Sequence, residues 1–280
     1  MTAAEANRLL YSELAQSYDR VESCVVNSRQ RRRLRDALDE ALNAVPRTSR
    51  VLDACGGSGN VSAILAGQGV VPTVVDVSRE MLARWESRAE SMGLHPETHV
   101  APIEEFLRAD GRRWDLIVFS SALHHLEDPD AVLVTAATCL APGGAILTIY
   151  DPTLATRTLL VLRMVDWLGH LLLHRPREFV AVGQRWLARR RSGAPTNNAP
   201  HIGRLAERHA LGGIDDLKLH RTLQNHHLNV VIHERSYEAR LLVVRLLLRL
   251  SRRPSSFRFL AQGALPDSSH QVMPVPIRRC

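Results

Sequence analysis

Residues 51–60, VLDACGGSGN, decide how this chain folds. The stretch begins as a short apolar run, continues through a turn that holds Gly56, Gly57 and Gly59, and leads into a helical pattern. Glycines let a backbone pass close to a ligand, and the N-terminus of the helix that follows attracts negative or dipolar groups. The segment therefore predicts a strand, a glycine-rich turn and a helix that bind a small anionic or dipolar ligand.

The turn fits the dinucleotide-binding pattern G-x-G-x-x-G poorly. Gly57 and Gly59 would require a third glycine where Ser62 stands, and Asp53 lies before the turn. The sequence therefore disfavours NAD as the ligand.

Outward from the turn, apolar runs alternate with helical patterns. Strands separated by such patterns indicate βαβ units and hence a parallel sheet. The residues from Leu9 to Val45 predict one or two amphipathic helices before the first strand. The predicted strands are 50–54, 72–76, 97–101, 115–119, 145–150, 228–235 and 256–262, and the later helices are 61–67, 80–89, 130–140, 215–226 and 239–252. The predicted fold class is α/β, a Rossmann-like doubly wound and mostly parallel sheet.

Four blocks of the sequence resemble class I S-adenosylmethionine (SAM) methyltransferases. Asp53 with the glycine turn is similar to their motif I, although Cys55 stands where many members have the first glycine. The blocks at 114–129 (WDLIVFSSALHHLEDP) and 140–152 (LAPGGAILTIYDP) look like the family's fourth and fifth strands, and 226–237 (HHLNVVIHERSY) looks like its sixth. The similarity is particularly to small-molecule and quinone methyltransferases, and it implies SAM as the cofactor.

The resemblance also implies which residues hold the cofactor. Asp76, at the end of the second strand, would accept hydrogen bonds from the ribose hydroxyls. The alternative is that Asp76 only caps the next helix, a role for which Ser78 is another candidate. Pro102 stands where many members have an adenine-binding Asp, so Ile103 or Glu104 would take that role. The expected cofactor-binding set is Tyr18, Asp53, Cys55, Gly56, Gly57, Gly59, Asp76, Val77, Met81, Ile103, Glu104 and Ser120. Tyr18 could equally be a core tyrosine of an amphipathic helix.

The catalytic candidates are His124 and His125, after the fourth strand, with Asp151 at the end of the fifth. A histidine titrates near neutral pH and so suits the removal of a proton from a hydroxyl acceptor. Adjacent residues of a helix point about 100° apart, so only one of the pair should face the acceptor. The alternative is that one ring packs under the cofactor and the other bonds locally. We expect no metal, since His170 and His174 have no third ligand nearby.

The alternation of predicted strands and helices is interrupted after Asp151, where a long apolar helical stretch follows. Its apolar sides are typical of a lid packed on the protein or of a wall of a hydrophobic acceptor pocket. The expected organisation is N-terminal helices that cover the cofactor (1–48), the SAM-binding core (49–152), a helical lid or acceptor-binding insertion (153–213), the rest of the core (214–262) and a loose tail (263–280).

Arginines gather on one side of the helix predicted near 240–253, with aliphatic residues opposite. This pattern fits a membrane-surface or partner-binding helix, or an ordinary helix with a solvated basic face.

Composition narrows the function classes further. The 280 residues are 45% hydrophobic and 23% charged, typical of a globular chain, and carry a net charge of +7. The basic clusters are short and contain few aromatic residues, so nucleic acid is not indicated. Cys24, Cys55, Cys139 and Cys280 form no CxxC pair, and no signal peptide or membrane span is evident. We therefore expect a cytoplasmic protein, with peripheral contact to a membrane left open.

The predicted function is O-methylation of a small, fairly hydrophobic molecule with a histidine base. One alternative is a quinone-like C-methyltransferase at a membrane surface. Another is a SAM-binding accessory protein or cyclase that transfers no methyl group, because a fold does not determine chemistry. A nucleic-acid methyltransferase is disfavoured, since no [DNS]-P-P-[YFW] motif follows the fourth strand. The sequence does not indicate the acceptor's identity or the oligomeric state.

Overall fold

The computed structural model describes residues 1–21, 28–46, 50–155, 162, 164–166, 168–169, 206, 209, 212–239, 241–264 and 278–279. Side chains at 16–21 and 278–279 are outside this description. Most of the predicted lid and tail therefore lies outside the described residues, as do His170 and His174.

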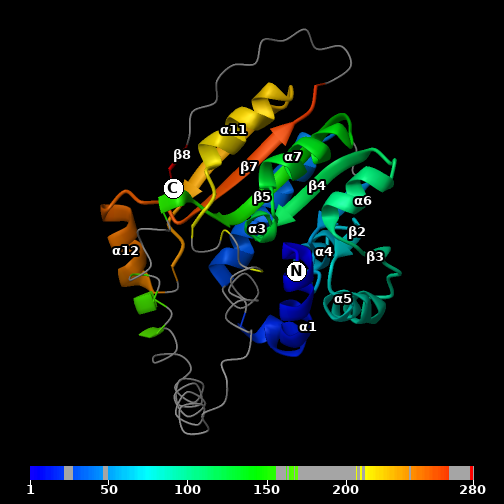
Figure 1. The fold of residues 1–280 in the computed structure, drawn as a ribbon, viewed down its shortest axis with the longest axis horizontal. Coiled ribbons are helices and arrows are strands. Elements are labelled where there is room, and N and C mark those ends of the chain that lie inside the picture. The colour runs from blue at the N-terminus through cyan, green and yellow to red at the C-terminus, as the bar shows by residue number, and fades with distance from the viewer. Residues whose placement is uncertain are drawn as a thin grey trace, which may run out of the picture.

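One eight-stranded sheet organises the described residues, in the order β3-β2-β1-β4-β5-β7-β6-β8 (Figure 1). Strand β7 pairs antiparallel with both β5 and β6, and the other pairings are parallel. The strands are β1 Val51–Ala54, β2 Thr73–Asp76, β3 Thr98–Val100, β4 Trp114–Ser120, β5 Leu140–Pro152, β6 Asn229–Ser236, β7 Ser256–Gln262 and β8 Arg278–Arg279. The predicted doubly wound, mostly parallel sheet is confirmed.

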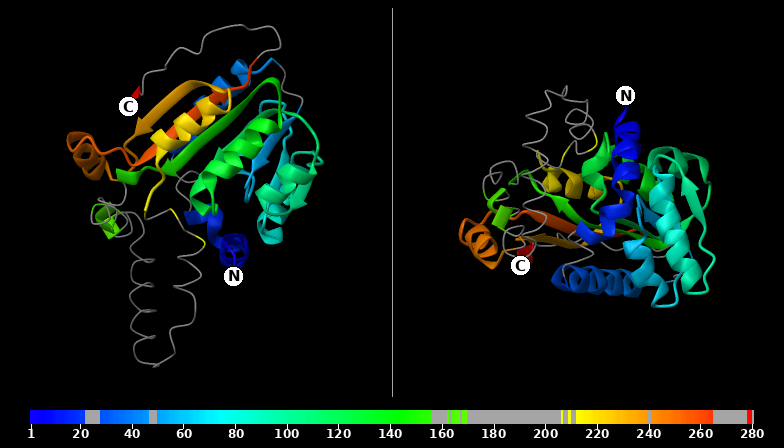
Figure 2. Two further views of the ribbon diagram at one scale, coloured as in Figure 1. Left: turned by 45° about the horizontal axis from the view of Figure 1, so that its top comes forward. Right: turned by 90° about the horizontal axis from the view of Figure 1, so that it is seen from below.

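Helices cover both faces of the sheet (Figure 2). One core joins β1, β4 and β5 to α6, α7 and α11, and another joins the opposite face to α3 and α4. Trp85 of α5 packs with Val74 of β2 in a smaller cluster. The helices are α1 Ala3–Val21, α3 Ser28–Ala44, α4 Asn60–Ala66, α5 Arg79–Ser91, α6 Ile103–Ala109, the 3-10 helix η1 Leu123–His125, α7 Pro129–Thr138, α11 Asp216–Asn225 and α12 Leu242–Leu250.

Three elements differ from the sequence prediction. Helix α6 was not predicted, although Pro102 is its N-cap and Glu104 and Glu105 fill its first turn, both signals of a helix start. Strand β5 begins five residues earlier than expected, because Leu140 pairs with Trp114 before a register shift. Strand β8 pairs with β6 within the segment expected to be a loose tail.

Among the described residues, no helix combines the length and the hydropathy that crossing a bilayer requires. The parallel strands β1, β2, β4 and β5 end at one edge of the sheet, which is where open α/β sheets bind ligands. That edge carries the glycine turn after β1, Asp76 after β2, η1 after β4 and Asp151 in β5.

Candidate active site

The turn after β1 needs glycine at two positions for different reasons. A Cβ on Gly56 would stand 2.5 Å from Val74 Cγ1, so the turn passes too close to β2 for a side chain. Gly59 has φ +75°, and a Cβ there would stand 2.6 Å from the ring of Trp85. Cys55 has φ +58°, a conformation that glycine adopts without strain, at the position where the resembled family often has glycine.

Asp53 of β1 forms hydrogen bonds with the helix that follows this turn. It is buried, and its Oδ2 accepts hydrogen bonds from the Ser62 hydroxyl (2.5 Å) and the Ser62 backbone N–H (3.2 Å). Burial raises the pKa of Asp53 to about 7, although the two bonds from Ser62 oppose that shift. Asp53 ties the start of α4 to β1, and it is not among the residues that line the nearby cavity.

Asp76 ends β2 and faces a cavity. Its Oδ2 accepts the backbone N–H of Gly57 and its Oδ1 that of Ser78, each at 2.9 Å. Burial raises the pKa of this carboxyl group. The N-cap of α5 is Ser78, whose hydroxyl accepts the N–H of Met81 (3.2 Å), so the alternative role of Asp76 as helix cap falls to Ser78.

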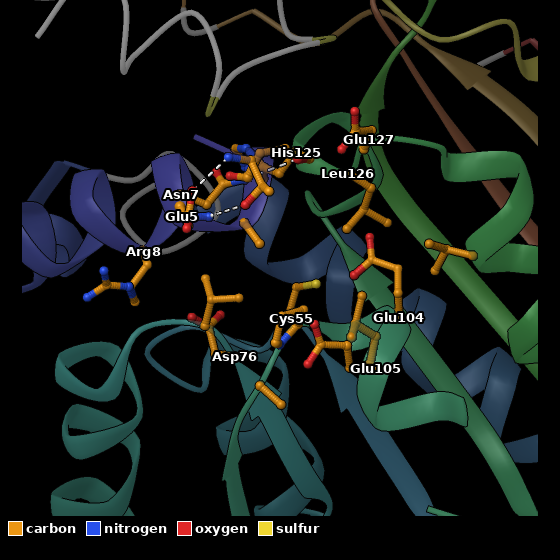
Figure 3. A pocket seen from close by; sticks show the side chains of 18 of the residues that line it. Glu5, Asn7, Arg8, Cys55, Asp76, Glu104, Glu105, His125, Leu126 and Glu127 are labelled. Carbon is orange, nitrogen blue, oxygen red and sulfur yellow. Dashed lines mark hydrogen bonds between the residues drawn. The ribbon is translucent and has the colours of Figure 1, made fainter. Parts of the chain in front are cut away.

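The cavity has a volume of about 700 Å³ and lies between α1, the glycine turn, the start of α6 and η1 (Figure 3). Of the expected cofactor residues, it is lined by Cys55, Asp76, Val77, Ile103 and Glu104. Its lining contains six carboxyl side chains, Glu5, Asp76, Glu104, Glu105, Glu127 and Asp128, and two guanidinium groups, Arg8 and Arg108. The site is therefore acidic.

Of the other expected cofactor residues, none whose side chain the structure describes is among the lining residues. Met81 is buried, and its Cε lies 3.2 Å from the point where a Cβ on Gly57 would stand. Ser120 is half-buried at the end of β4 and is not among the lining residues. The side chain of Tyr18 lies outside the described residues.

Six residues from Thr2 to Arg8, at the start of α1, line the cavity: Thr2, Ala3, Ala4, Glu5, Asn7 and Arg8. The sequence predicted a cofactor cover from residues 1–48 but did not identify these side chains. Asn7 Nδ2 also donates a hydrogen bond to the carbonyl oxygen of His125 (3.1 Å), which fixes α1 over η1. The amphipathic pattern predicted a helix only from Leu9, so these lining residues lie before the predicted start, and no local signal marked them as facing the cavity.

His124 and Asp151 form a buried pair. The Nδ1 of His124 lies 2.8 Å from Asp151 Oδ1, and the backbone N–H of His124 donates to the same oxygen at 3.1 Å. A carboxylate accepts hydrogen bonds, so Nδ1 of a neutral His124 carries the proton and Nε2 is the basic nitrogen. Asp151 is fully buried, and its Oδ2 has no hydrogen-bond partner among the described residues.

His125 has a different environment. It lines the cavity, its Nδ1 lies 2.9 Å from the carbonyl oxygen of Ala206, and its Nε2 lies 3.2 Å from the Tyr11 hydroxyl. A carbonyl only accepts, so Nδ1 holds the proton and the tyrosine donates to Nε2. Burial and the neighbouring His124 hold the pKa of His125 well below its usual range. His125 is therefore a neutral wall of the cavity, whereas His124 is the histidine oriented by a carboxylate.

Within the described part of the chain, no three His, Cys, Asp or Glu side chains are grouped so that they could hold a metal ion. The expected pair His170 and His174 is outside that part.

Comparisons with known proteins agree on one family. A family model described as a methyltransferase domain matches residues 26–192, more than half of the chain. A ubiquinone biosynthesis O-methyltransferase of Pasteurella multocida is 31% identical over 106 residues, 35% of this chain and 44% of that protein. The corresponding protein of Xylella fastidiosa is 32% identical over 108 residues, 38% of this chain and 44% of that protein. These matches span less than half the length of the curated relatives.

Two solved structures share the fold. The N-methyltransferase NodS of Bradyrhizobium japonicum, in complex with S-adenosylhomocysteine, has a TM-score of 0.54 and 16% identity over 92% of this chain and 98% of that chain. A magnesium protoporphyrin IX methyltransferase of Synechocystis with bound SAM has a TM-score of 0.56 and 12% identity over 94% and 98%.

Proposed function

The chain belongs to the methyltransferase domain family, and from this premise we propose that it transfers the methyl group of SAM to a hydroxyl group of a small, fairly hydrophobic molecule. The family expected from the strand motifs is confirmed. The observation that carries the proposal is the His124–Asp151 pair, which lies at the same sheet edge as Asp76. The pair is buried behind His125, which lines the cavity, and is not itself among the lining residues.

The cavity fits SAM better than a dinucleotide. Its volume of about 700 Å³ lies within the usual range for a small-molecule site. Six carboxyl groups against two guanidinium groups would repel the two phosphates of NAD, whereas SAM carries a positive sulfonium. When bound, SAM supplies an activated methyl group on that sulfonium.

Asp76 is the residue proposed to hold the ribose. Its two oxygens already accept backbone N–H groups, which fix the carboxylate, and a carboxylate has further lone pairs for two hydroxyl groups. Val77 and Ile103 supply apolar walls for the adenine, and Glu104 or the backbone at Ile103 supplies its polar partner. Gly57, with φ +53°, lets the backbone approach the methionine end.

His124 is the proposed general base. Its Nε2 accepts the proton of the acceptor hydroxyl while the acceptor attacks the methyl group. Asp151 fixes the ring through Nδ1 and stabilises the imidazolium that forms, since a negative charge 2.8 Å away favours the charged ring. The neutral His125 packs beside it, with ring centroids 3.9 Å apart, between the pair and the cavity that His125 lines.

The acceptor class rests on the partial match to ubiquinone O-methyltransferases, which act on hydroxyl groups, as their name states. A methyl-labelled SAM assay with an alkylated catechol, its dimethyl ether and an alkylated aniline tests this choice. We expect label on the catechol only. His124→Ala should abolish transfer and still bind SAM, whereas His99→Ala, at a half-exposed histidine in β3, should change neither. Methylation of the aniline alone, or full transfer by His124→Ala, would contradict the proposal.

A further inference from the structure

Helix α12 presents an apolar face to solvent. Leu242, Val243, Leu246, Leu247 and Leu250 are 44 to 80% exposed, and Leu250 is the most exposed of them. At 100° per residue they cover one continuous side of the helix. Val244 and Leu248, on the other side, are buried with Tyr237. The exposed leucines are therefore not needed to hold α12 on the domain.

A second segment with exposed apolar side chains is joined to the start of α12. Met164, Val165 and Leu168 are 62, 49 and 37% exposed. Asp166 Oδ1 accepts the backbone N–H of Leu241 at 2.7 Å, which joins this segment to the start of α12. Leu162 packs in the same small cluster as Val244. We call the eight exposed side chains the apolar face: Met164, Val165, Leu168, Leu242, Val243, Leu246, Leu247 and Leu250.

Arginines flank the apolar face. Arg249, Arg252 and Arg253 are exposed, and by helical spacing Arg249 lies beside Leu242 and Leu246. Arg245 precedes them, and its pKa is lowered by burial and by the positive charges of Arg29 and Arg249. Positive charge is therefore concentrated beside the apolar face, along one border at Arg245 and Arg249 and at the C-terminal end of α12 at Arg252 and Arg253.

The apolar face lies at the ligand-binding edge of the sheet. Strand β7 begins at Ser256, shortly after α12, and Ser256 pairs with Pro152 while Phe257 pairs with Asp151. Ser236, at the end of β6, also pairs with Ser256. Helix α12 therefore connects two strands at the edge that carries Asp151 and His124, and it projects outward from that edge (Figure 1).

We propose that the apolar face and its flanking arginines dock this protein on an anionic lipid bilayer, with α12 lying in the headgroup layer. Leucines on one side and arginines along the border are the pattern of an interfacial helix, where the leucines enter the acyl boundary and the guanidinium groups meet lipid phosphates. A second copy of the chain is disfavoured as the occupant, because it would bring two arginine borders together. Docking on a bilayer would bring the site close to a hydrophobic acceptor dissolved in the lipid. That consequence rests on the proposed function, and the docking itself does not.

Flotation with phosphatidylcholine vesicles and with vesicles that contain phosphatidylglycerol tests the proposal on the full chain. We expect binding to the anionic vesicles and little to the neutral ones, with weaker binding at high salt. Leu246→Asp with Leu250→Asp should abolish binding. Arg249→Gln with Arg252→Gln and Arg253→Gln should weaken it by about 100-fold, since each arginine contributes about fivefold.

Matched controls separate this surface from general charge and hydrophobicity. Leu217→Asp with Met92→Asp alters exposed apolar residues elsewhere, and Arg35→Gln with Arg50→Gln and Arg221→Gln removes the same charge from scattered exposed sites. Both controls should bind anionic vesicles within about twofold to threefold of the wild type, allowing for the smaller long-range attraction.

The proposal is overturned if the wild type does not float with anionic vesicles, or if the control sets weaken binding as much as the α12 sets. A dimer in light scattering that Leu246→Asp dissociates, without vesicle binding, would assign the surface to a second copy instead. None of these measurements uses SAM or turnover. The docking proposal can therefore be refuted while the proposed methyl transfer stands, and the methyl transfer can be refuted while the docking proposal stands.

Discussion

Two glycines of the fold, Gly59 and Gly69, allow a matched test of how the turn after β1 is built. Both have positive φ, +75° and +83°. An alanine at either position must adopt a left-handed backbone conformation, which lowers the free energy of unfolding by about 1–2 kcal/mol. They differ in their surroundings. A Cβ on Gly59 would stand 2.6 Å from ring atoms of the fully buried Trp85, whereas nothing lies within 4 Å of one on Gly69.

Gly59→Ala must therefore also displace a packed indole, and overpacking of that kind costs about 1–3 kcal/mol more. We expect Gly69→Ala to lower the free energy of unfolding by about 1–2 kcal/mol and Gly59→Ala by about 2–5 kcal/mol. Urea unfolding with unchanged m-values measures both. Equal losses for the two variants would show that Trp85 does not constrain the turn, and the account of the turn would be wrong.

The remaining predictions concern ionisable groups. Asp151→Asn should lower the turnover number at least tenfold and leave SAM affinity within about twofold, because it removes the charge that stabilises a protonated His124, and steady-state kinetics with calorimetry measures both effects. Loss of SAM affinity without loss of turnover would contradict the role of Asp151. The free energy of unfolding should depend on pH through Asp53, because its pKa in the folded protein is about 7, above the ordinary 3.8. The contribution of Asp53 to stability therefore falls as the pH rises through that interval. Between pH 5 and 8 the free energy of unfolding should fall by about 2–3 kcal/mol more in the wild type than in Asp53→Asn, and parallel urea profiles of the two proteins would exclude a raised pKa.

Strands β1 to β7 were predictable because each contains a short apolar run between turn residues, and β7 has the predicted bounds, 256–262. Strand β8 has only two residues, both arginine, and gives no such signal. Helix α6 was missed because its seven residues give little periodicity, although Pro102 and the two following glutamates mark its start. Short helices depend on tertiary packing, and here Ile103, Phe106 and Leu107 supply it against the sheet.

The sequence predicted candidate residues for the site but not which contacts each of them makes. The spacing of His124 and His125 left open which ring would serve as base, and η1 is a 3-10 helix, so the α-helical angle between them did not apply. The proposed choice of His124 rests on Asp151 and Tyr11, which are distant in sequence and contact different histidines. Likewise, the cavity wall formed by the first turns of α1 is a tertiary contact with no local signature.

The most direct test of whether this cavity binds SAM is a calorimetric titration of the purified chain with SAM, S-adenosylhomocysteine and NADH, repeated on Asp76→Ala. We expect binding of the two adenosyl ligands and not of NADH, with affinity at least tenfold weaker in the variant, because Asp76 supplies the carboxylate at the end of β2. A ligand at about 100 times its Kd would also stabilise the fold by about 2.7 kcal/mol, which gives an independent thermal readout. Equal affinity of wild type and variant, or preferential binding of NADH, would contradict the assignment of this cavity to SAM.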